Sequence, residues 1–301
     1  MLLHFEGRHE TRPPCARFRL TGVDSLKSRV RVLLTDTPLR YVSAPVHREL
    51  TRLELAAVRF RDGRPAGADS HTRSLAAVTA IVKTFERPKQ LQRLLESLRR
   101  LFPAVRVIVA DDSRTPTQEA GVRTIALPFD VGVSAGRQAA LAEVKTEFTW
   151  VLDDDFVLYR RTRLLPVLRA LNEQPRLDIV GGAVVDVPLG IKRSGATSPI
   201  YPTKAAPVVP LGTRIGRLIV RDKVLNFFVG RTSRLREVGW DPALKRLDHA
   251  DFFTRARGVL VTAYDDEFRC LHAQTPFARE YMRQRSNWHA DAALLNERYF
   301  K

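Results

Sequence analysis

The sequence has 301 residues, of which 44% are hydrophobic and 28% are charged, which excludes a disordered or fibrous chain and predicts a globular protein. A chain of this length can form one full α/β domain with a sizeable core and a smaller accessory region. Lysine and arginine outnumber aspartate and glutamate by 50 to 33, so the net charge is +17 and an anionic partner is expected.

The first part of the chain differs in pattern from the rest. Hydrophobic and polar residues alternate at 29–34 and at 53–60, which predicts short strands, and the segment 62–67 (DGRPAG) is typical of a turn or linker. We therefore expect a small β-rich accessory module over residues 1–72. The chemical motifs all lie after it, in a second domain that we expect to span residues 73–301.

From residue 75 onward, predicted strands and helices alternate. Apolar runs predict strands near 77–82, 105–110, 124–127, 148–152 and 177–180. Pro88 is suited to the first turn of a helix, and leucines at 91, 94, 95 and 98 share one face of it. Ser134 is a candidate N-cap for a helix that reaches Val144. This alternation indicates βαβ units, and hence an α/β fold with a mostly parallel sheet flanked by helices.

Two acidic clusters follow predicted strands. Asp111 and Asp112 come directly after the second strand, and Asp153, Asp154 and Asp155 follow the apolar run that ends at Leu152. Open α/β sheets bind ligands at the carboxyl ends of their strands, so both clusters are candidate binding residues. An acidic pair alone can also be a turn former or helix cap, and this alternative remains open for Asp111 and Asp112.

Three consecutive aspartates repel one another unless a cation or a proton offsets their charge. A divalent metal ion is the natural compensation, because carboxylate oxygens are hard ligands suited to Mg²⁺ or Mn²⁺. If the strand continues through the run, Asp153 and Asp155 point to one side and Asp154 to the other. The sequence therefore predicts a metal site that also meets a diphosphate.

Several segments occur in the order found in glycosyltransferase family 2, and the closest resemblance is to the ganglioside-type β-1,4-N-acetylgalactosaminyltransferases. The segments are 78–88 (VTAIVKTFERP), 110–113 (ADDS), 135–137 (AGR), 150–156 (WVLDDDF), 177–183 (LDIVGGA), 225–232 (LNFFVGRT) and 237–242 (EVGWDP). This resemblance implies a GT-A fold, which is Rossmann-like, together with a UDP-sugar donor, best guessed as UDP-GalNAc, and Mn²⁺ or Mg²⁺ as the cofactor. It also implies a transfer that inverts the anomeric centre.

The resemblance assigns donor-binding roles by position. Thr84 and Arg87 correspond to residues that meet the nucleotide, and Asp111 or Asp112 to the residue that holds the uracil or ribose. Arg137 lies on the first turn of its predicted helix, close to amide groups that favour phosphate. In the family's D-x-D motif, Asp153 resembles the donor contact and Asp155 the metal ligand, and Asp154 between them belongs to the same donor-binding run.

The resemblance also implies the remaining catalytic groups. Asp251, in the segment 249–253 (HADFF), corresponds to the family's acidic base, and His272 corresponds to the histidine that completes the metal site. Asp251 would accept the proton of the attacking hydroxyl while the metal offsets charge on the leaving diphosphate. Asp248 and Glu237 are the next candidates for the base.

Other readings of the sequence stay open. The donor could be UDP-Gal, UDP-Glc or UDP-GlcNAc, because a few pocket contacts decide the sugar. A nucleotidyltransferase would also use aspartates at strand ends, but the segment 83–88 (KTFERP) does not resemble the phosphate loop that such enzymes need. A basic module that binds nucleic acid or membrane without catalysis is the third alternative, and no nucleic-acid motif supports it.

Partners and location follow from composition. The expected acceptor is a glycan or glycoconjugate hydroxyl. Only Cys15 and Cys270 are available for disulfides, and no run of about 18 apolar residues occurs, so we expect a cytoplasmic protein. Its positive charge could hold it peripherally on an anionic membrane, at the inner face. Nucleic acid is not an expected partner.

Overall fold

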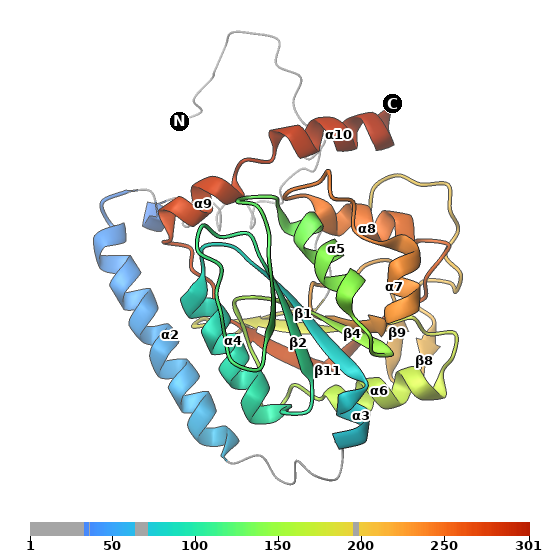
Figure 1. Ribbon diagram of the computed structural model, residues 1–301, viewed down its shortest axis with the longest axis horizontal. Coiled ribbons are helices and arrows are strands. Elements are labelled where there is room, and N and C mark those ends of the chain that lie inside the picture. Colours follow the sequence, from blue (N-terminus) through green and yellow to red (C-terminus); the bar gives the residue numbers. More distant parts are fainter. Residues whose placement is uncertain (1–32, 36, 64–71, 195–198) are drawn as a thin grey trace.

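The computed structural model describes residues 33–35, 37–63, 72–194 and 199–301, and its elements alternate between strands and helices (Figure 1). The helices are α2 (Arg40–Asp62), α3 (Thr72–Ala76), α4 (Pro88–Leu101), α5 (Val133–Glu143), α6 (Leu164–Glu173), α7 (Thr232–Val238), α8 (Asp248–Ala256), α9 (Arg279–Arg285) and α10 (His289–Phe300). The strands are β1 (Val78–Thr84), β2 (Arg106–Asp111), β3 (Arg123–Ala126), β4 (Phe148–Asp153), β5 (Phe156–Val157), β6 (Ile179–Asp186), β7 (Ile191–Arg193), β8 (Arg214–Ile215), β9 (Leu218–Val220), β10 (Phe228–Arg231) and β11 (Thr262–His272).

The strands form one sheet in the order β3-β2-β1-β4-β10-β6-β11-β9-β8. Strands β3, β2, β1 and β4 run parallel, and β6 runs parallel to β11. Strand β10 lies antiparallel between β4 and β6, so it joins the two parallel halves. The predicted α/β fold with a mostly parallel sheet is confirmed, and strands occur at all of the expected positions 77–82, 105–110, 124–127, 148–152 and 177–180. Their ends lie within two residues of the predicted ones, except that β6 continues to Asp186, six residues past the predicted end.

Two hydrophobic clusters lie on the two faces of the sheet. One contains the inward side chains of α4 and α6, and it includes the four leucines predicted to share a face of α4. The other contains buried side chains of α5, α7 and α8. Trp150 on β4 is fully buried and packs among Phe102, Phe227 and Phe268. These clusters fix the strand ends that carry the acidic residues.

The strand predicted at 53–60 is wrong, because this segment belongs to helix α2. The other predicted strand, 29–34, lies outside the described residues except for Leu33 and Leu34, which are helical. The described N-terminal part is therefore helical rather than β-rich. The domain boundary after residue 72 stays a prediction.

Helix α2 packs against the rest of the described chain through one face. Its Leu55 and Val58 contact a small cluster formed by Val187, Leu271 and Ala273, and the carboxylate of Asp62 accepts hydrogen bonds from Arg100 and the Arg160 amide. Figure 1 shows α2 at the margin of the molecule, beside α4. None of the helices in the described part of the chain has the length and apolarity that a membrane span requires.

Candidate active site

The two acidic clusters meet at one edge of the sheet. In the register of the parallel strands, Thr84 at the end of β1 pairs with Asp111 on β2, and Lys83 pairs with Asp153 on β4. The clusters therefore flank the end of β1, as the sequence predicted from their positions after two parallel strands. This edge corresponds to the ligand-binding side of open α/β sheets.

The aspartate run leaves the strand after Asp153, and this changes where the side chains point. Asp154 and Asp155 form a turn between β4 and β5, so the alternation expected of extended backbone does not hold. Both carboxylates contact the guanidinium group of Arg87, whereas Asp153 contacts Arg137. The prediction that Asp153 and Asp155 share a side is therefore wrong, and its cause is the turn.

Arg87 links the two buried aspartates. Its Nη1 donates to Asp154 Oδ1 at 2.8 Å, and its Nη2 donates to Asp155 Oδ2 at 2.8 Å. The guanidinium also lies over the ring of Tyr281, 4.4 Å from the ring centre. The Thr84 hydroxyl donates a hydrogen bond to Asp154 Oδ2 at 2.8 Å. Thr84 and Arg87, both predicted to meet the nucleotide, thus hold the acidic turn in place.

Burial and ion pairing shift the pKa values of Asp154 and Asp155 in opposite directions. Burial raises the pKa of Asp154 to about 7, although Arg87 opposes the shift. The pKa of Asp155 is instead held well below its usual range, because His272 and Arg87 outweigh the effect of burial. Asp155 is therefore the more strongly ionised of the pair, as a metal ligand must be.

His272, at the end of β11, lies between two carboxylates. Its Nε2 is 3.1 Å from Asp155 Oδ2, and its Nδ1 is 2.8 Å from Asp186 Oδ1 at the end of β6. Gln274 donates from Nε2 to the same Asp186 oxygen at 3.1 Å. Burial lowers the pKa of His272, but the two carboxylates outweigh it and raise this pKa to about 9.

Asp155 and His272 are suited to share a divalent cation. Their facing atoms, Oδ2 and Nε2, are 3.1 Å apart, a separation that fits neighbouring ligands of an ion that binds at about 2.0–2.1 Å. Within the described residues, no group of three or more His, Cys, Asp and Glu side chains is arranged to hold a metal ion. The described residues therefore do not provide a complete set of protein ligands. The pair suits an ion that takes its other ligands from a diphosphate and water.

Asp186 should act on this site through the imidazole. A carboxylate that accepts a hydrogen bond from Nδ1–H keeps the proton on Nδ1, so that Nε2 can bind a metal once it loses its own proton, and loss of such a partner costs about 10–100-fold in metal affinity. We expect Asp186→Asn to weaken Mn²⁺ binding by this amount, measured by electron paramagnetic resonance titration. Asp222→Asn, which breaks an ion pair with Arg257 outside the site, is the matched control and should bind Mn²⁺ like the wild type. Equal affinity of both variants would contradict this role.

Asp111 and Asp112 are fully buried and shape the loops at the edge. Asp111 accepts hydrogen bonds from the amides of Ser113 and Thr117, at 2.9 and 2.8 Å. Asp112 pairs with Lys83 and accepts from the amide of Gly132 at 3.0 Å. The turn-forming role that the sequence left open is therefore present in both residues, and contact with a nucleotide stays a prediction for them.

Arg137 connects the aspartate run to helix α8. It lies on the first turns of α5 and is buried, and its Nη2 donates to Asp153 Oδ1 while its Nη1 donates to Asp248 Oδ2, both at 2.6 Å. Burial raises the pKa of Asp248, although Arg137 opposes this shift. Asp248 is thus a carboxylate in contact with the site network and with an increased affinity for a proton.

Asp251 lies three residues later on α8 and has different partners. Its side chain is buried, and its Oδ1 accepts hydrogen bonds from Arg298 and the Tyr299 hydroxyl, both at 2.7 Å. Its Oδ2 accepts from Arg255 at 2.8 Å. Asp251 therefore joins α8 to α10, which lies beside it in Figure 1. The structure shows it in contact with none of the other predicted site residues, and its role as base stays a prediction.

Sequence reasoning did not identify four residues that complete the site. They are Lys83, Asp186, Gln274 and Tyr281. Lys83 had a visible signal, since it is a charged residue in an otherwise apolar strand. Asp186 and Gln274 had none, because only the pairing of β6 with β11 brings them to His272.

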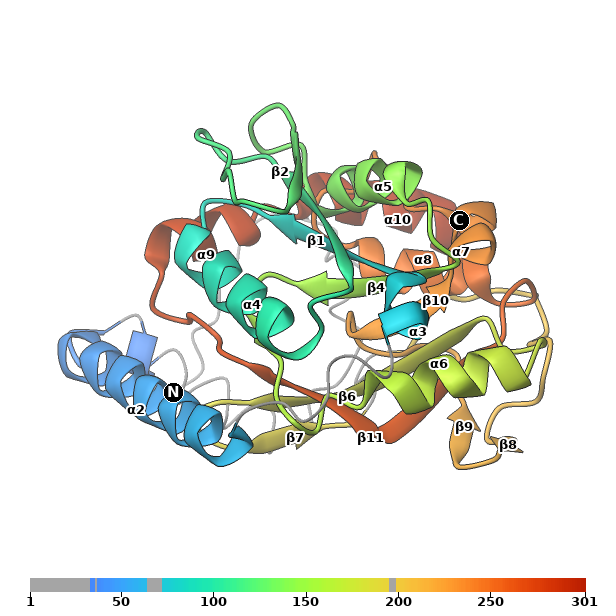
Figure 2. The same ribbon diagram turned by 60° about the horizontal axis from the view of Figure 1, so that its bottom comes forward.

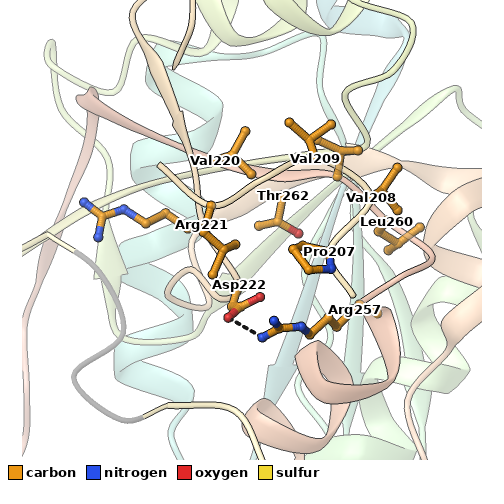
Figure 3. A pocket seen from close by; sticks show the side chains of 12 residues that line it. Pro207, Val208, Val209, Val220, Arg221, Asp222, Arg257, Leu260 and Thr262 are labelled. Atoms are coloured by element: carbon orange, nitrogen blue, oxygen red, sulfur yellow. Dashed lines mark hydrogen bonds and ion pairs between the residues drawn. The ribbon is translucent and has the colours of Figure 1, made fainter. Parts of the chain in front are cut away.

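A separate hollow, shown in Figure 3, lies away from this edge. It is lined by the segment 207–211, β9 and the region after α8, and the ion pair between Asp222 and Arg257 crosses its rim. None of the predicted site residues lines it. The acidic edge is therefore the candidate site on chemical grounds.

Comparison with known proteins finds a matching family and similar named enzymes. The family described as Glycosyl transferase family 2 matches residues 79–238. The Homo sapiens beta-1,4 N-acetylgalactosaminyltransferase 1 is 38% identical over 213 residues, which cover 65% of this chain and 38% of that protein. The Mus musculus beta-1,4 N-acetylgalactosaminyltransferase 2 is 36% identical over 196 residues, 61% of this chain and 37% of that protein. The chain thus matches well under half the length of these relatives.

Solved structures show a similar fold at low sequence identity. The crystal structure of S. aureus TarS 1–349 has a TM-score of 0.50 and 19% identity, and covers 72% of this chain and 67% of that chain. The same protein in complex with UDP-GlcNAc has a TM-score of 0.51 and 19% identity, with coverage of 66% and 58%. These likenesses support the GT-A fold expected from the sequence.

Proposed function

Because the chain belongs to glycosyl transferase family 2, we propose that it transfers a sugar from a UDP-sugar donor to a hydroxyl of a glycan or glycoconjugate acceptor, with a divalent metal ion and inversion of the anomeric centre. The observation that carries this proposal is the approach of His272 to Asp155 at the ends of the parallel strands. An ionised carboxylate and a histidine with a fixed ring are suited to hold Mn²⁺ or Mg²⁺ against a diphosphate.

The residues of the edge then have distinct tasks in the transfer. Arg87 and Thr84 hold the turn that presents Asp155, and Asp186 orients His272. A bound divalent ion would supply neutralisation of the charge that develops on the leaving diphosphate. Arg137, a buried cation beside Asp153, adds positive potential near the same edge. The arrangement favours departure of a nucleotide diphosphate from the anomeric carbon.

The acceptor hydroxyl needs a base, and helix α8 carries two candidates. The resemblance assigns this role to Asp251, whose carboxylate already accepts three hydrogen bonds. Asp248 contacts Arg137, and burial raises its pKa, which moves its proton affinity toward the range useful for a general base. The geometry therefore supports Asp248, and Asp251 is the alternative. Glu237 pairs with Arg234 at the surface of α7 and is not supported.

GalNAc is our proposed donor sugar. Its support is the identity of 36–38% to proteins named as N-acetylgalactosaminyltransferases. The structural relative TarS is named in complex with UDP-GlcNAc, so an N-acetylhexosamine is common to both comparisons. UDP-GlcNAc, UDP-Gal and UDP-Glc are the competing donors.

We also propose a cytoplasmic location with peripheral contact to an anionic membrane, on the basis of the net charge of +17. Nucleic acid is not proposed as a partner. A nucleotidyltransferase is not proposed either, because the family match and the Asp155–His272 pair together favour sugar transfer.

A donor-hydrolysis screen tests the proposed function. The four UDP-sugars are incubated with the full chain and Mn²⁺, with parallel reactions in EDTA, and released UDP is measured. We expect hydrolysis of UDP-GalNAc to exceed that of the other donors and to stop in EDTA. If only another UDP-sugar is hydrolysed, the proposed donor sugar is wrong. Release of pyrophosphate from a nucleoside triphosphate instead would contradict glycosyl transfer.

A further inference from the structure

Helix α2 has a second apolar face, which points away from the protein. Its large apolar side chains follow at intervals of three, four and finally seven residues, which places them on one side of a helix with 3.6 residues per turn. They are the N-cap residue Leu39 and, within the helix, Val42, Val46, Leu50, Leu53 and Phe60, and each is at least half exposed. We call these six residues the outer stripe of α2.

The outer stripe is distinct from the face that packs on the protein. The packing face carries Thr51, which is buried, together with Leu55 and Val58, which contact the cluster around Leu271. The two faces lie on opposite sides of the helix. Because α2 is already held by its packing face, the outer stripe is not needed for the described core, and an exposed apolar row of this length indicates an interaction surface.

Exposed basic side chains lie on both flanks of the stripe. Arg48, Arg52 and Arg59 are exposed on one flank, where Glu49 lies closer to the stripe than they do, and Arg61 is exposed on the other flank, near Glu54. On the flank with three arginines, one ion pair is formed, between Arg52 and Glu49 at 3.0 Å. Apolar residues bordered by arginines are typical of helices that lie in the interface of an anionic membrane, where the stems of long cationic side chains cover apolar surface and their heads reach lipid phosphates.

We propose that the outer stripe of α2 lies on an anionic lipid surface and sets the orientation of the protein on it. Charge complementarity selects this occupant. A second copy of the chain would bring two such arginine rows together, and each copy carries a net charge of +17, so self-association through the stripe is opposed electrostatically. A membrane with anionic headgroups can bury the apolar stripe and at the same time pair with the arginines.

This orientation has a consequence for access to the active site. Figures 1 and 2 both place α2 at one margin of the molecule, away from α7, α8 and α10. A membrane under α2 would therefore lie on the opposite margin from α8, the helix that carries Asp248. The inference depends on the surface of α2 and not on the donor chemistry proposed above.

Vesicle sedimentation with the full chain tests the proposal. Vesicles of phosphatidylcholine, with and without phosphatidylglycerol, are compared for the wild type, a stripe variant and two further variants. The stripe variant is Val46→Ser with Leu50→Ser and Leu53→Ser, and the basic variant is Arg48→Gln with Arg52→Gln and Arg59→Gln. The control variant is Leu189→Ser with Val208→Ser and Leu211→Ser, which removes exposed apolar side chains outside α2.

We expect the wild type and the control to bind vesicles that contain phosphatidylglycerol and to be released by salt. The stripe variant should partition more than about tenfold less, and the basic variant should lose its preference for anionic vesicles. Equal binding by the stripe variant and the wild type would overturn the proposal. A second result would also overturn it. In that result, light scattering shows that the wild type is a dimer and the stripe variant a monomer, and the wild type does not bind vesicles.

A second readout does not depend on how the multiple variants fold. Phe60→Trp places an indole at the most exposed position of the stripe, where 89% of the side chain is accessible. We expect its fluorescence to be quenched by brominated lipid in anionic vesicles, while Phe129→Trp, outside α2, is not quenched. Equal behaviour of the two variants would contradict contact through α2.

UDP release with Mn²⁺ is measured in parallel. The stripe and basic variants should hydrolyse free donor like the wild type, because none of their substitutions touches the acidic edge. Loss of vesicle binding with intact hydrolysis thus separates failure of this inference from failure of the proposed transferase activity.

Discussion

Asp248→Asn is expected to slow sugar transfer by about 10²–10⁴-fold, the usual contribution of a general base. Asparagine keeps the size of the side chain and can still accept a hydrogen bond from Arg137, but it cannot take a proton from the acceptor hydroxyl. UDP binding with Mn²⁺ should stay within a few-fold of the wild type, because Arg137 retains its contact with Asp153. Steady-state transfer kinetics and calorimetry with UDP measure the two effects separately.

Asp251→Asn is the matched comparison on the same helix. If Asp251 served only as a helix cap, no change in stability would be expected, since asparagine caps a helix about as well as aspartate. The structure revises that expectation, because the buried carboxylate accepts from Arg255, Arg298 and Tyr299, and its loss should cost about 1–3 kcal/mol of stability. The folded fraction should retain transfer. Collapse of transfer in Asp251→Asn with normal transfer in Asp248→Asn would return the base to Asp251.

Asp155→Asn and His272→Ala should each lower Mn²⁺-dependent affinity for UDP by more than about 100-fold, because direct ligands matter at least as much as the partners that orient them. In EDTA, we expect the wild type to bind UDP as weakly as these variants. Without a cation, the acidic run repels the diphosphate. Isothermal titration calorimetry with UDP, in Mn²⁺ and in EDTA, measures this difference.

Asp265→Asn provides the control for these two variants. Asp265 is a buried carboxylate on β11 that pairs with Arg217, and it lies outside the acidic edge. Its variant should keep Mn²⁺-dependent UDP binding even if its melting temperature falls. A wild type that binds UDP equally well in EDTA would contradict the metal bridge, and so would full Mn²⁺ dependence in Asp155→Asn.

The parallel sheet and the meeting of the acidic clusters were predictable from the sequence. Apolar runs of strand length alternate with helical patterns after residue 75, and the aspartates follow those runs directly. Position after a parallel strand determines the edge at which a side chain lies, so Asp111 and Asp153 had to meet at the same edge. This part of the site depends on local pattern alone.

Prediction from the local pattern failed where one segment fits both the two-residue period of a strand and the 3.6-residue period of a helix. The run 53–60 alternates like a strand, yet it also carries apolar residues at helical spacing on both its packing face and its outer stripe. Ser134 shows a second failure, because α5 begins one residue earlier, at Val133, and Gly132 takes the N-cap position with a φ of 104°. Propensity does not decide such boundaries, since tertiary packing overrides it.

Partnerships across the fold could not be predicted either. Asp186 reaches His272 only because β6 and β11 are neighbours, and Arg298 reaches Asp251 only because α10 packs on α8. The resemblance assigned a base to α8, but the choice between two carboxylates one helical turn apart depends on which one faces Arg137. Contacts of this kind come from the fold as a whole and have no signature in the neighbouring residues.

The antiparallel strand β10 has a consequence for how such an enzyme can change its acceptor. Because β10 runs against β4 and β6, its first residue, Phe228, lies beside Val151 in the carboxyl-terminal half of β4 and beside Gly181 near the start of β6. The segment that leads into β10 therefore arrives at the catalytic edge from the opposite direction to the loops that carry the aspartates. Loops tolerate insertion and exchange better than strands do. For the transfer proposed above, we expect exchange of this incoming segment to change the acceptor more than the donor.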